Sequence, residues 1–528
     1  MKFLNNKIIA AALMVSVAAA GCKKQFDEYA SNPNLPTSVP AYLLLRQVEN
    51  DIPVLPGGDA DKFCQFTLSS YTYYGTNEYW TGAAGLSYGT LRNVVAMEKE
   101  AEKSSGANNP YSALAKFFKA YLFVDMSLKV GDLPMSEALK GLDNQTPKYD
   151  TQKDIFKQAL QLLEDANTQM ASLISSSNSA ILGDFFYKEN ISNPKDGLQS
   201  LKQWQKVVNT YKLRLLIHLS KKEADADLNI KQKFNETVSN PTKYPVMESM
   251  SDNLEYVYNT AYNKYPNNKE NFGFDALRLC VAATWLNNLS ALNDLRAMKV
   301  ADPARGLGFS DTSFKSFVGA SNGEDVSTMG GKVVAGLYSP IGRKRYYDGL
   351  TGENTFIIGY PEMCFNIAEA INRGWTTGNA EDWYQKGVKA MFGFYGITDG
   401  NNTVSFLRPG ALGPGDYVNY TVNFSFSNYF NQPAVKYAGN NATGLSQILL
   451  QKYLAFGRNS GFEAYYQWRR TGVPAFLTGP GIGNSGVIPL RWQYPSSELS
   501  TNKTNYQAAV QSQYSGNDNI NAKMWIIQ

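Results

Sequence analysis

Histidine is almost absent from this sequence: among 528 residues the only one is His218. Metal sites that depend on several imidazole ligands are therefore excluded. Most Ser-His and Cys-His nucleophile arrangements are also removed, because the stretch YKLRLLIHLS places His218 on an otherwise apolar helix. The sequence predicts that His218 packs in the core or against a neighbouring helix.

Cysteine is nearly as scarce, with four residues in the chain. Cys64, Cys280 and Cys364 are far apart and show no CxxC spacing, which argues against the common zinc sites and disulfide frameworks. The sequence also lacks a Walker A loop, a GxGxxG motif after a strand and an HExxH motif. We therefore expect no metal and no cofactor, and we expect these three thiols to be small apolar core residues.

Charge is sparse as well: 18% of the residues are charged, and the formal net charge is +4. A nearly balanced surface gives no electrostatic basis for binding nucleic acid. A long apolar run is missing too, because Ile8–Ala20 has only 13 residues, whereas a membrane-spanning helix needs about 20.

The first residues instead have the pattern of a secretory signal. Lys2 and Lys7 precede the apolar run, and small residues lead into Cys22. The order Ala-Ala-Gly-Cys resembles a bacterial lipobox, in which the signal is cut before the cysteine and the thiol is acylated. We expect residues 1–21 to be removed and Cys22 to be lipidated. The alternative is a plain secretory cleavage site. Two or more acyl chains would anchor the chain stably to a membrane.

Helical periodicity dominates the rest of the chain. Apolar stripes predict helices in four adjacent stretches of the first half and in two pairs of the second half, and Thr151 is the expected N-cap of one of them. The predicted helices fall in residues 89–104, 111–130, 152–170, 201–222, 361–375, 379–396, 444–457 and 461–472. Helical hairpins of this length predict a mainly α fold with tetratricopeptide-like packing, long loop-rich insertions and a few short strands.

The chain divides into a signal, a tether and one domain. We place the signal at residues 1–21, an Asn/Pro-rich tether at 22–40 and a single domain at 41–528. Within the domain the helical scaffold covers about 90–220 and 362–472, and the loop-rich insertions cover about 225–360 and 398–444. The tail from about 478 is expected to be mostly irregular.

Aromatic residues are abundant, with 33 Tyr, 27 Phe and 8 Trp. The stretch SSYTYYGTNEYWTGAAGLSYG at 69–89 combines rings with amide and hydroxyl side chains and has no period that would bury all of them. Rings stack on the apolar faces of sugars, and amides meet the sugar hydroxyls. The expected ligand-binding residues are Tyr73, Tyr74, Asn77, Tyr79 and Trp80, with Trp285 beside Asn287 as a second candidate. The alternative for each ring is packing of the loop onto the helices.

Five stretches, taken together and in order, carry a family resemblance. They are FDEYASNPNLPTSVP after Cys22, GDLPMSEAL at 131–139 with TPKYDTQKDIFKQAL behind it, AEAINRGW at 368–375, QKYLAF with GFEAYYQWRRTGVP at 451–474, and IPLRWQYPSSELSTN near the end. This ordered set resembles the SusD/RagB family, the surface nutrient-binding lipoproteins of Bacteroidetes.

The resemblance implies a tetratricopeptide-like fold and an outer-membrane lipoprotein that faces outward. It implies binding of oligosaccharide, glycan or peptide, delivery to a SusC-like TonB-dependent transporter, and no catalytic activity. In the 461–474 stretch, Arg469 and Arg470 are expected to tie helix ends by charged hydrogen bonds.

Two other functions remain open from the residues alone. The first is an α-helical glycoside hydrolase, which needs two carboxylates about 5–9.5 Å apart; Glu362 and Glu369 lie seven residues apart on one predicted helix face. The second is a purely structural or adhesive surface lipoprotein.

Overall fold

The computed structural model describes residues 38–178, 181, 183–187 and 197–528. Residues 1–21 and Cys22 lie outside these described residues, as does most of the expected tether. Most of the regular structure is helical, which confirms the predicted mainly α fold. None of the described helices combines the length and the apolarity that crossing a bilayer requires.

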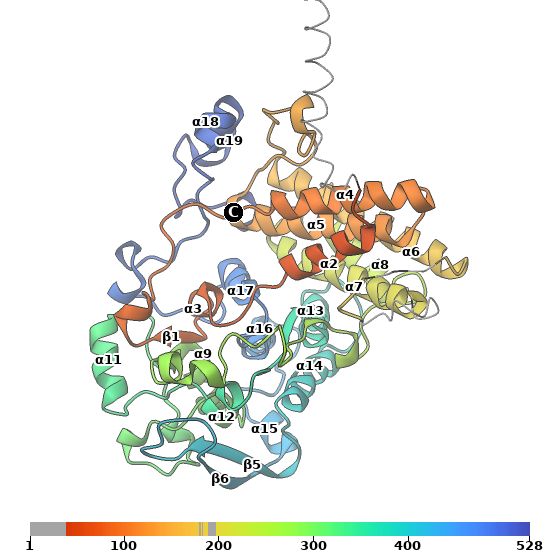
Figure 1. Ribbon diagram of the computed structural model, residues 1–528. Helices are drawn as coiled ribbons and strands as arrows, with labels where there is room; N and C mark the ends of the chain where they lie inside the picture. The colour runs from red at the N-terminus through yellow and green to blue at the C-terminus, as the bar shows by residue number, and fades with distance from the viewer. Residues whose placement is uncertain (1–37, 179–180, 182, 188–196) are drawn as a thin grey trace, which may run out of the picture.

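Four consecutive helices form the larger helical array, drawn in orange and yellow in Figure 1. They are α4 (Tyr88–Ser105), α5 (Pro110–Val130), α6 (Gln152–Ser175) and α7 (Gly197–His218), and each packs on the next, while α2 (Ala41–Asp51) packs on α4 and α8 (Ile230–Ser239) on α7. The predicted face of α6 is confirmed, since Ile155, Ala159 and Leu163 are buried. α5 is buried on nearly all sides because α4 and α6 both cover it.

Local sequence signals set the ends of these helices. Asn109 and Ser112 form a capping box at the start of α5, where Pro110 occupies the first turn. The hydroxyl of Thr151 accepts a hydrogen bond from the Asp154 backbone N–H, which confirms the predicted N-cap of α6. Gly131 ends α5 with a φ of 97°, a conformation that favours glycine.

The second helical group is built around α13 (Tyr360–Asn372), which packs on α7, α14 (Ala380–Phe394) and α16 (Ala442–Phe456). α17 (Glu463–Thr471) lies against α16 and supplies the expected arginine ties. Arg469 donates to the backbone oxygens of Leu128 and Leu490, and Arg470 forms an ion pair with the fully buried Glu369 of α13. The predicted structural role of both arginines is thus confirmed.

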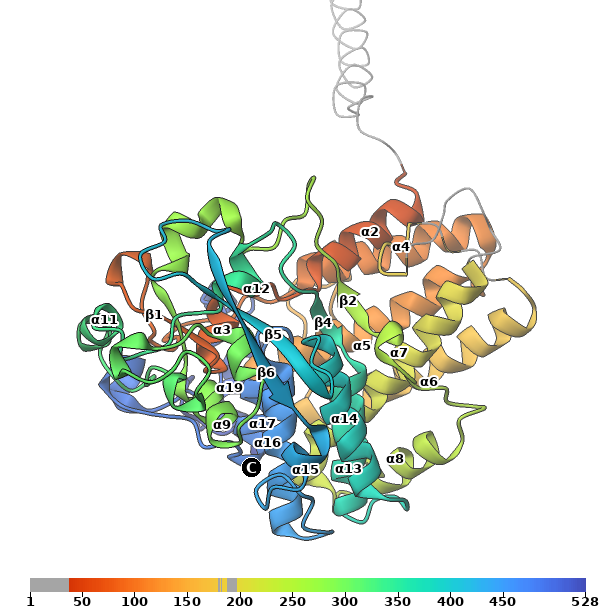
Figure 2. The ribbon, with the colours of Figure 1, turned by 90° about the horizontal axis from the view of Figure 1, so that it is seen from below.

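Three two-stranded antiparallel sheets lie in the loop-rich regions. β1 (Thr67–Ser69) pairs with β3 (Leu279–Val281), β2 (Leu254–Tyr256) with β4 (Thr355–Ile358), and β5 (Gly400–Leu407) with β6 (Tyr417–Phe424). Figure 2 shows the β5–β6 hairpin lying across one face of the molecule. Short helices complete these regions: α3 (Asp59–Phe63), α9 (Ala283–Ala291), α10 (Ala297–Val300), α11 (Val326–Val334), α12 (Arg343–Tyr347) and α15 (Phe426–Phe430).

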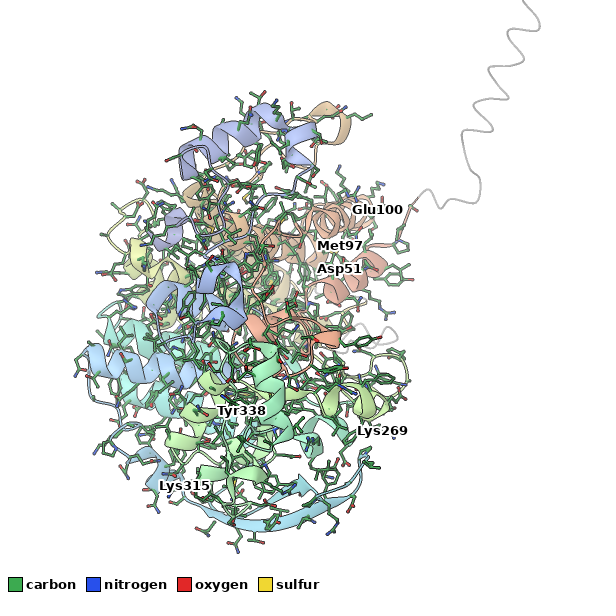
Figure 3. All side chains as sticks on the ribbon, turned by 90° about the vertical axis from the view of Figure 1, so that its left-hand side faces the viewer. Asp51, Met97, Glu100, Lys269, Lys315 and Tyr338 are labelled. Atoms are coloured by element: carbon green, nitrogen blue, oxygen red, sulfur yellow. The ribbon has the colours of Figure 1, made fainter. Side chains whose placement is uncertain are left out.

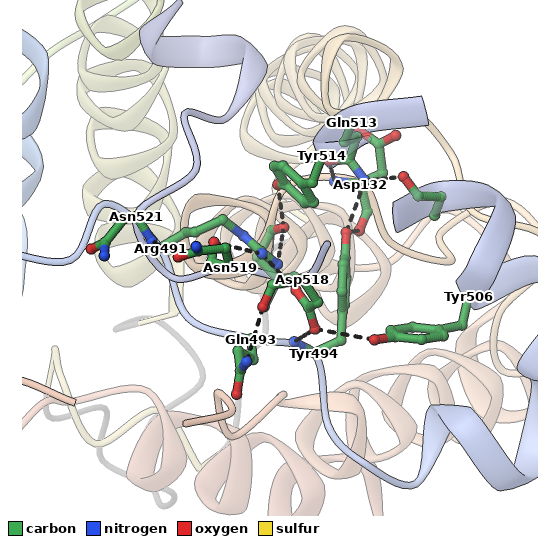
Figure 4. Close-up of polar contacts among 12 residues, drawn as sticks. Asp132, Arg491, Gln493, Tyr494, Tyr506, Gln513, Tyr514, Asp518, Asn519 and Asn521 are labelled. Atoms are coloured by element: carbon green, nitrogen blue, oxygen red, sulfur yellow. Dashed lines mark hydrogen bonds and ion pairs between the residues drawn. The ribbon is translucent and has the colours of Figure 1, made fainter. Parts of the chain in front are cut away.

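The tail is more regular than expected. It forms α18 (Glu498–Thr501) and α19 (Lys503–Tyr514) and folds back over the end of α5. Buried Arg491 pairs with Asp518 at 2.5 Å and stacks on the ring of Tyr514 (Figure 4). The Tyr514 hydroxyl donates to the Val130 oxygen. The weak helical period of α19 concealed it in the sequence, because only a few of its residues are buried.

The scarce residues lie where the sequence predicted. Cys64, Cys280 and Cys364 are free and buried. His218 ends α7 in the interior, with Nε2 3.1 Å from the carboxylate of Glu463.

Candidate ligand-binding site

The ring-rich loop begins where β1 ends. β1 pairs with β3 in the register Thr67↔Val281 to Ser69↔Leu279. The pairing continues for one more residue, because the N–H and the hydroxyl of Ser70 both donate to the oxygen of Arg278. Residues 71–76 therefore leave the protein body beside the segment 273–278.

Asn77 closes this loop at its base. Its side-chain oxygen accepts from the Ser69 N–H at 2.9 Å, and its Nδ2 donates to the Ser69 oxygen at 2.8 Å. The amide thus imitates one step of a strand ladder and is almost completely buried. These two hydrogen bonds hold the ends of the short loop close together.

Tyr79 and Trp80 fix the exit of the loop. The Tyr79 ring stacks on Phe63 at 5.0 Å, and its hydroxyl donates to the Phe63 oxygen. Burial raises the pKa of Tyr79 well above its usual value, so the hydroxyl stays protonated as a donor. The Trp80 ring lies flat on Trp492 with centroids 3.6 Å apart, and its indole N–H donates to the Arg491 oxygen.

The tip of the loop is exposed and apolar. Tyr71 and Tyr73 are 51% and 81% exposed, and their ring centroids lie 6.4 Å apart. The guanidinium of Arg278 stands 5.6 Å from the centre of the Tyr71 ring and donates to the backbone oxygens of Gly273 and Phe274. The side chains of Phe274 (63% exposed) and Leu277 add further apolar surface from this neighbouring segment.

We call the group formed by Tyr71, Tyr73, Phe274, Leu277 and Arg278 the Tyr71 platform. Neighbouring exposed apolar side chains are a common feature of interaction sites. Rings with polar rims are suited to a ligand that is itself flat, apolar on its faces and polar at its edges.

The predicted site residues divide into two groups. Tyr73 is on the platform. Asn77, Tyr79 and Trp285 are buried, with Trp285 edge-on against Phe66 at 5.3 Å, and Trp80 is half-buried in the Trp492 stack, so these four residues position the loop and the core. The backbone of Tyr74 lies in a short 3-10 helix, η1 (Thr72–Tyr74), and its side chain lies outside the described part of the structure.

Phe274, Leu277 and Arg278 escaped the sequence analysis. They lie about 200 residues from the tyrosines, on and just after the π-helical turn η6 (Phe272–Ala276). The stretch NFGFDALR carries no period that would separate exposed rings from buried ones. The pairing of three-residue strands that brings them to Tyr71 is also too short to predict.

The glutamates of the hydrolase alternative are held by arginines. Glu362 is buried and binds the guanidinium of Arg214 through both oxygens. Glu369 is buried and bound by Arg470 and Arg373. Burial alone would raise the pKa of Glu369, but these guanidinium groups outweigh it and lower the pKa to about 2. Both carboxylates therefore serve as anchors between helices.

Metal ligands do not gather anywhere in the described ranges: no group of three His, Cys, Asp or Glu side chains there is placed to hold an ion.

Comparison with protein families gives one match that covers most of the chain. The SusD-like model described as "Starch-binding associating with outer membrane" matches residues 60–495. No curated protein matches the chain.

Solved structures with the same fold include SusD homologues. Two from Bacteroides fragilis are 28% and 29% identical, with TM-scores of 0.78 and 0.74, and each alignment covers 93% of this chain and 100% of the other. A chitin-binding SusD homologue from Flavobacterium johnsoniae is 20% identical with a TM-score of 0.66, over 92% of this chain and 98% of its own.

Proposed function

The chain belongs to the SusD-like family of starch-binding proteins that associate with the outer membrane, and from this premise we propose that it captures an oligosaccharide or glycan on the Tyr71 platform. It then delivers the ligand to a SusC-like TonB-dependent transporter. The observation that carries the proposal is the pair of exposed rings on a loop whose base is closed by Asn77.

The platform fits a sugar in shape and chemistry. Two rings 6.4 Å apart and tilted by 38° offer neighbouring apolar faces, on which successive sugar units can stack. Arg278 lies beside them with guanidinium N–H groups, which are donors without acceptor capacity. A peptide with aromatic residues is the other ligand class to be tested.

The proposed location is the cell surface. Acylation of Cys22 would anchor the protein in the outer membrane, and residues 22–40 would act as a tether ahead of one domain at 41–528. We expect radiolabelled palmitate to appear on the full chain and not on the Cys22→Ser variant. Unlabelled wild-type protein found soluble in the periplasm would contradict the anchor.

Binding is tested with a soluble form that begins at Lys23. Arrayed α-glucan, chitin, galacturonan and mucin oligosaccharides, together with casein tryptic peptides, identify the ligand class, and calorimetry measures the affinity. The Tyr71→Ala/Tyr73→Ala double variant should bind at least tenfold more weakly, because it removes both stacking faces. Leu142→Ala, which truncates an equally exposed apolar side chain on the helical scaffold, should bind normally.

Three results would overturn the proposal. Equal affinity of the double variant and the wild type would exclude the platform. Release of reducing sugar from the bound glycan would indicate an enzyme instead of a capture protein. Failure of a large β-barrel transporter to co-purify with the anchored protein would remove the delivery step and favour an adhesive lipoprotein.

A further inference from the structure

A hollow of about 330 Å³ lies between α9 and the 3-10 helix η8 (Phe314–Ser316). It is lined by Asn287, Ser290, Ala291, Asn293, Phe314, Lys315, Phe317 and Val318. Its volume falls at the lower end of the range of known ligand pockets, about 300–1,000 Å³. The lining combines amides, a hydroxyl, a cation and two phenyl rings.

The α9 wall of the hollow is polar because α9 has two different faces. Trp285 points into the core, whereas Asn287, two residues further along the helix, is exposed. The side-chain oxygen of Asn287 accepts from the Gly319 N–H at 2.8 Å. This contact fixes the amide and leaves the two N–H groups of Nδ2 as donors at the hollow.

The opposite wall is held firmly against α9. The hydroxyl of Ser290 donates to the Phe317 oxygen at 2.7 Å. At Gly319 the backbone approaches so closely that a Cβ would lie 2.5 Å from the Cα of Ala283. These contacts hold the backbone of residues 317–319 against α9, and a site whose walls are already ordered binds at a lower entropic cost.

Lys315 brings a positive charge to the rim. It is exposed, and its Nζ stands 5.7 Å from the centre of the Phe309 ring. Within the described residues no carboxylate forms an ion pair with it. An ammonium group beside amides and rings favours a ligand with an acidic substituent.

The hollow and the Tyr71 platform lie at opposite ends of the β1–β3 pair. The two strands are antiparallel, so Tyr71 follows the end of the pair at Ser69↔Leu279, whereas α9 leaves from the end at Thr67↔Val281. Figure 3 places Lys315 in the lower half of its view, well away from Met97 and Glu100 of the helical scaffold. The hollow and the platform are therefore formed by different residues.

We propose that this α9–η8 hollow is a second saccharide subsite, which takes a sugar unit carrying an acidic group, either a carboxylate or a sulfate ester. The proposal rests on saccharide capture at the platform. Two separated subsites on one chain favour a polymer that reaches both, because the second contact becomes intramolecular.

Calorimetry with matched probes tests the charge preference. Tetragalacturonate, its fully methyl-esterified form and a chondroitin sulfate tetrasaccharide are titrated into the soluble form. We expect an acidic probe to bind at least tenfold more tightly than the neutral ester, with the advantage falling from 50 to 500 mM NaCl. Preference for tetragalacturonate identifies a carboxylate, and preference for the chondroitin probe identifies a sulfate.

Two variants locate the binding. Lys315→Met removes the charge, and Ala291→Trp fills the hollow from an exposed position on α9. Each change should lower the affinity for the acidic probe at least tenfold. Lys503→Met, which removes an exposed lysine on α19, is the matched control and should bind as the wild type does. The Tyr71→Ala/Tyr73→Ala variant should bind the acidic probe with the affinity of the wild type.

The outcomes separate this inference from the platform function. Unchanged binding of the acidic probe to Lys315→Met and Ala291→Trp overturns the subsite, as does the absence of any binding of both acidic probes to the wild type. In both cases the platform function is judged separately, from the affinity of the Tyr71→Ala/Tyr73→Ala variant for the ligand found in the array. Loss of the acidic probe from the tyrosine variant alone would assign that probe to the platform and also overturn the subsite.

Discussion

Two side-chain atoms of one buried residue close the loop that carries the exposed tyrosines. The Asn77 amide bonds both the N–H and the oxygen of Ser69. No other side-chain type of this size offers an acceptor and a paired donor in one plane. Asn77 was expected to contact ligand, and its burial instead makes it the residue that sets the positions of Tyr71 and Tyr73.

We expect Asn77→Ala to destabilise the protein and to weaken saccharide binding together. The change leaves two buried backbone groups without partners, at about 1–3 kcal/mol each. Urea unfolding followed by fluorescence measures the first effect, and calorimetry on the folded protein measures the second. Asn401→Ala, an exposed asparagine of β5, is the control. Normal affinity of a destabilised Asn77→Ala variant would show that the loop does not need this closure.

A second prediction at this scale concerns Asp132. Burial raises the pKa of Asp132 to about 6, although the backbone N–H of Gln152 hydrogen-bonds the carboxylate and opposes the rise. A folded-state pKa above the unfolded value of about 3.9 means that ionised Asp132 destabilises the fold above pH 6 and that this penalty disappears as the pH falls.

Asp132→Asn should therefore be more stable than the wild type at pH 7.5, by about 2 kcal/mol, and the difference should shrink toward zero near pH 4. The amide oxygen can still accept from Gln152, so the hydrogen bond is kept. Free energies of unfolding in urea at both pH values measure the difference. A gap that does not change with pH would exclude the raised pKa.

At the scale of elements, buried ion pairs hold the helices of the second group together. Glu369 of α13 binds Arg470 of α17 through two hydrogen bonds and Arg373 of its own helix through a third. Such a pair fixes the register of two helices, while its net contribution to stability is small because both charges lose water.

Arg470→Met should destabilise the fold by about 3–5 kcal/mol, because it leaves a carboxylate buried with one partner fewer. The double variant Glu369→Leu/Arg470→Met should recover much of this loss, since the buried carboxylate is removed together with Arg470 and the partly exposed Arg373 can reach solvent. Chemical unfolding of both proteins makes the comparison. If the double variant is less stable than Arg470→Met alone, the cost arises from lost packing and not from the unpaired charge.

The helices could be predicted from the sequence, and the site only in part. The apolar period of α6 and the N-cap at Thr151 depend on residues that are close in the sequence, and the structure confirms both predictions. The contacts that bury Tyr79 and Trp80 join residues up to 411 positions apart, such as Trp80 and Arg491. Nothing in the ring-rich stretch itself distinguishes a ring that meets Trp492 from one that meets solvent.

For the whole molecule, the two ends of the described chain are fastened to the same helical array. α2 packs on α4 at one end. At the other end the Ile526 N–H donates to Gln152, and the Ile527 oxygen accepts from Lys221. In the sequence, the loop-rich regions that form the platform and the α9–η8 hollow therefore lie between two segments that both pack on this helical array.

Ile526→Ala should therefore lower the stability of the whole domain in a single transition. Its side chain is 2% exposed, and truncating a buried isoleucine costs about 2–5 kcal/mol. Val334→Ala, at an exposed position of α11, should change the free energy of unfolding by less than about 0.5 kcal/mol. Urea unfolding monitored by circular dichroism and by fluorescence provides the test, and separate transitions for the two signals would contradict it.

The bonds between Asn77 and Ser69 also have an evolutionary consequence. They close the base of the loop, and the side chains of Tyr71 and Tyr73 are exposed, so substitutions at these two positions leave the scaffold intact. Under the proposed function, a change of ligand then requires substitutions in one short loop, while the residues that hold this loop in place stay as they are.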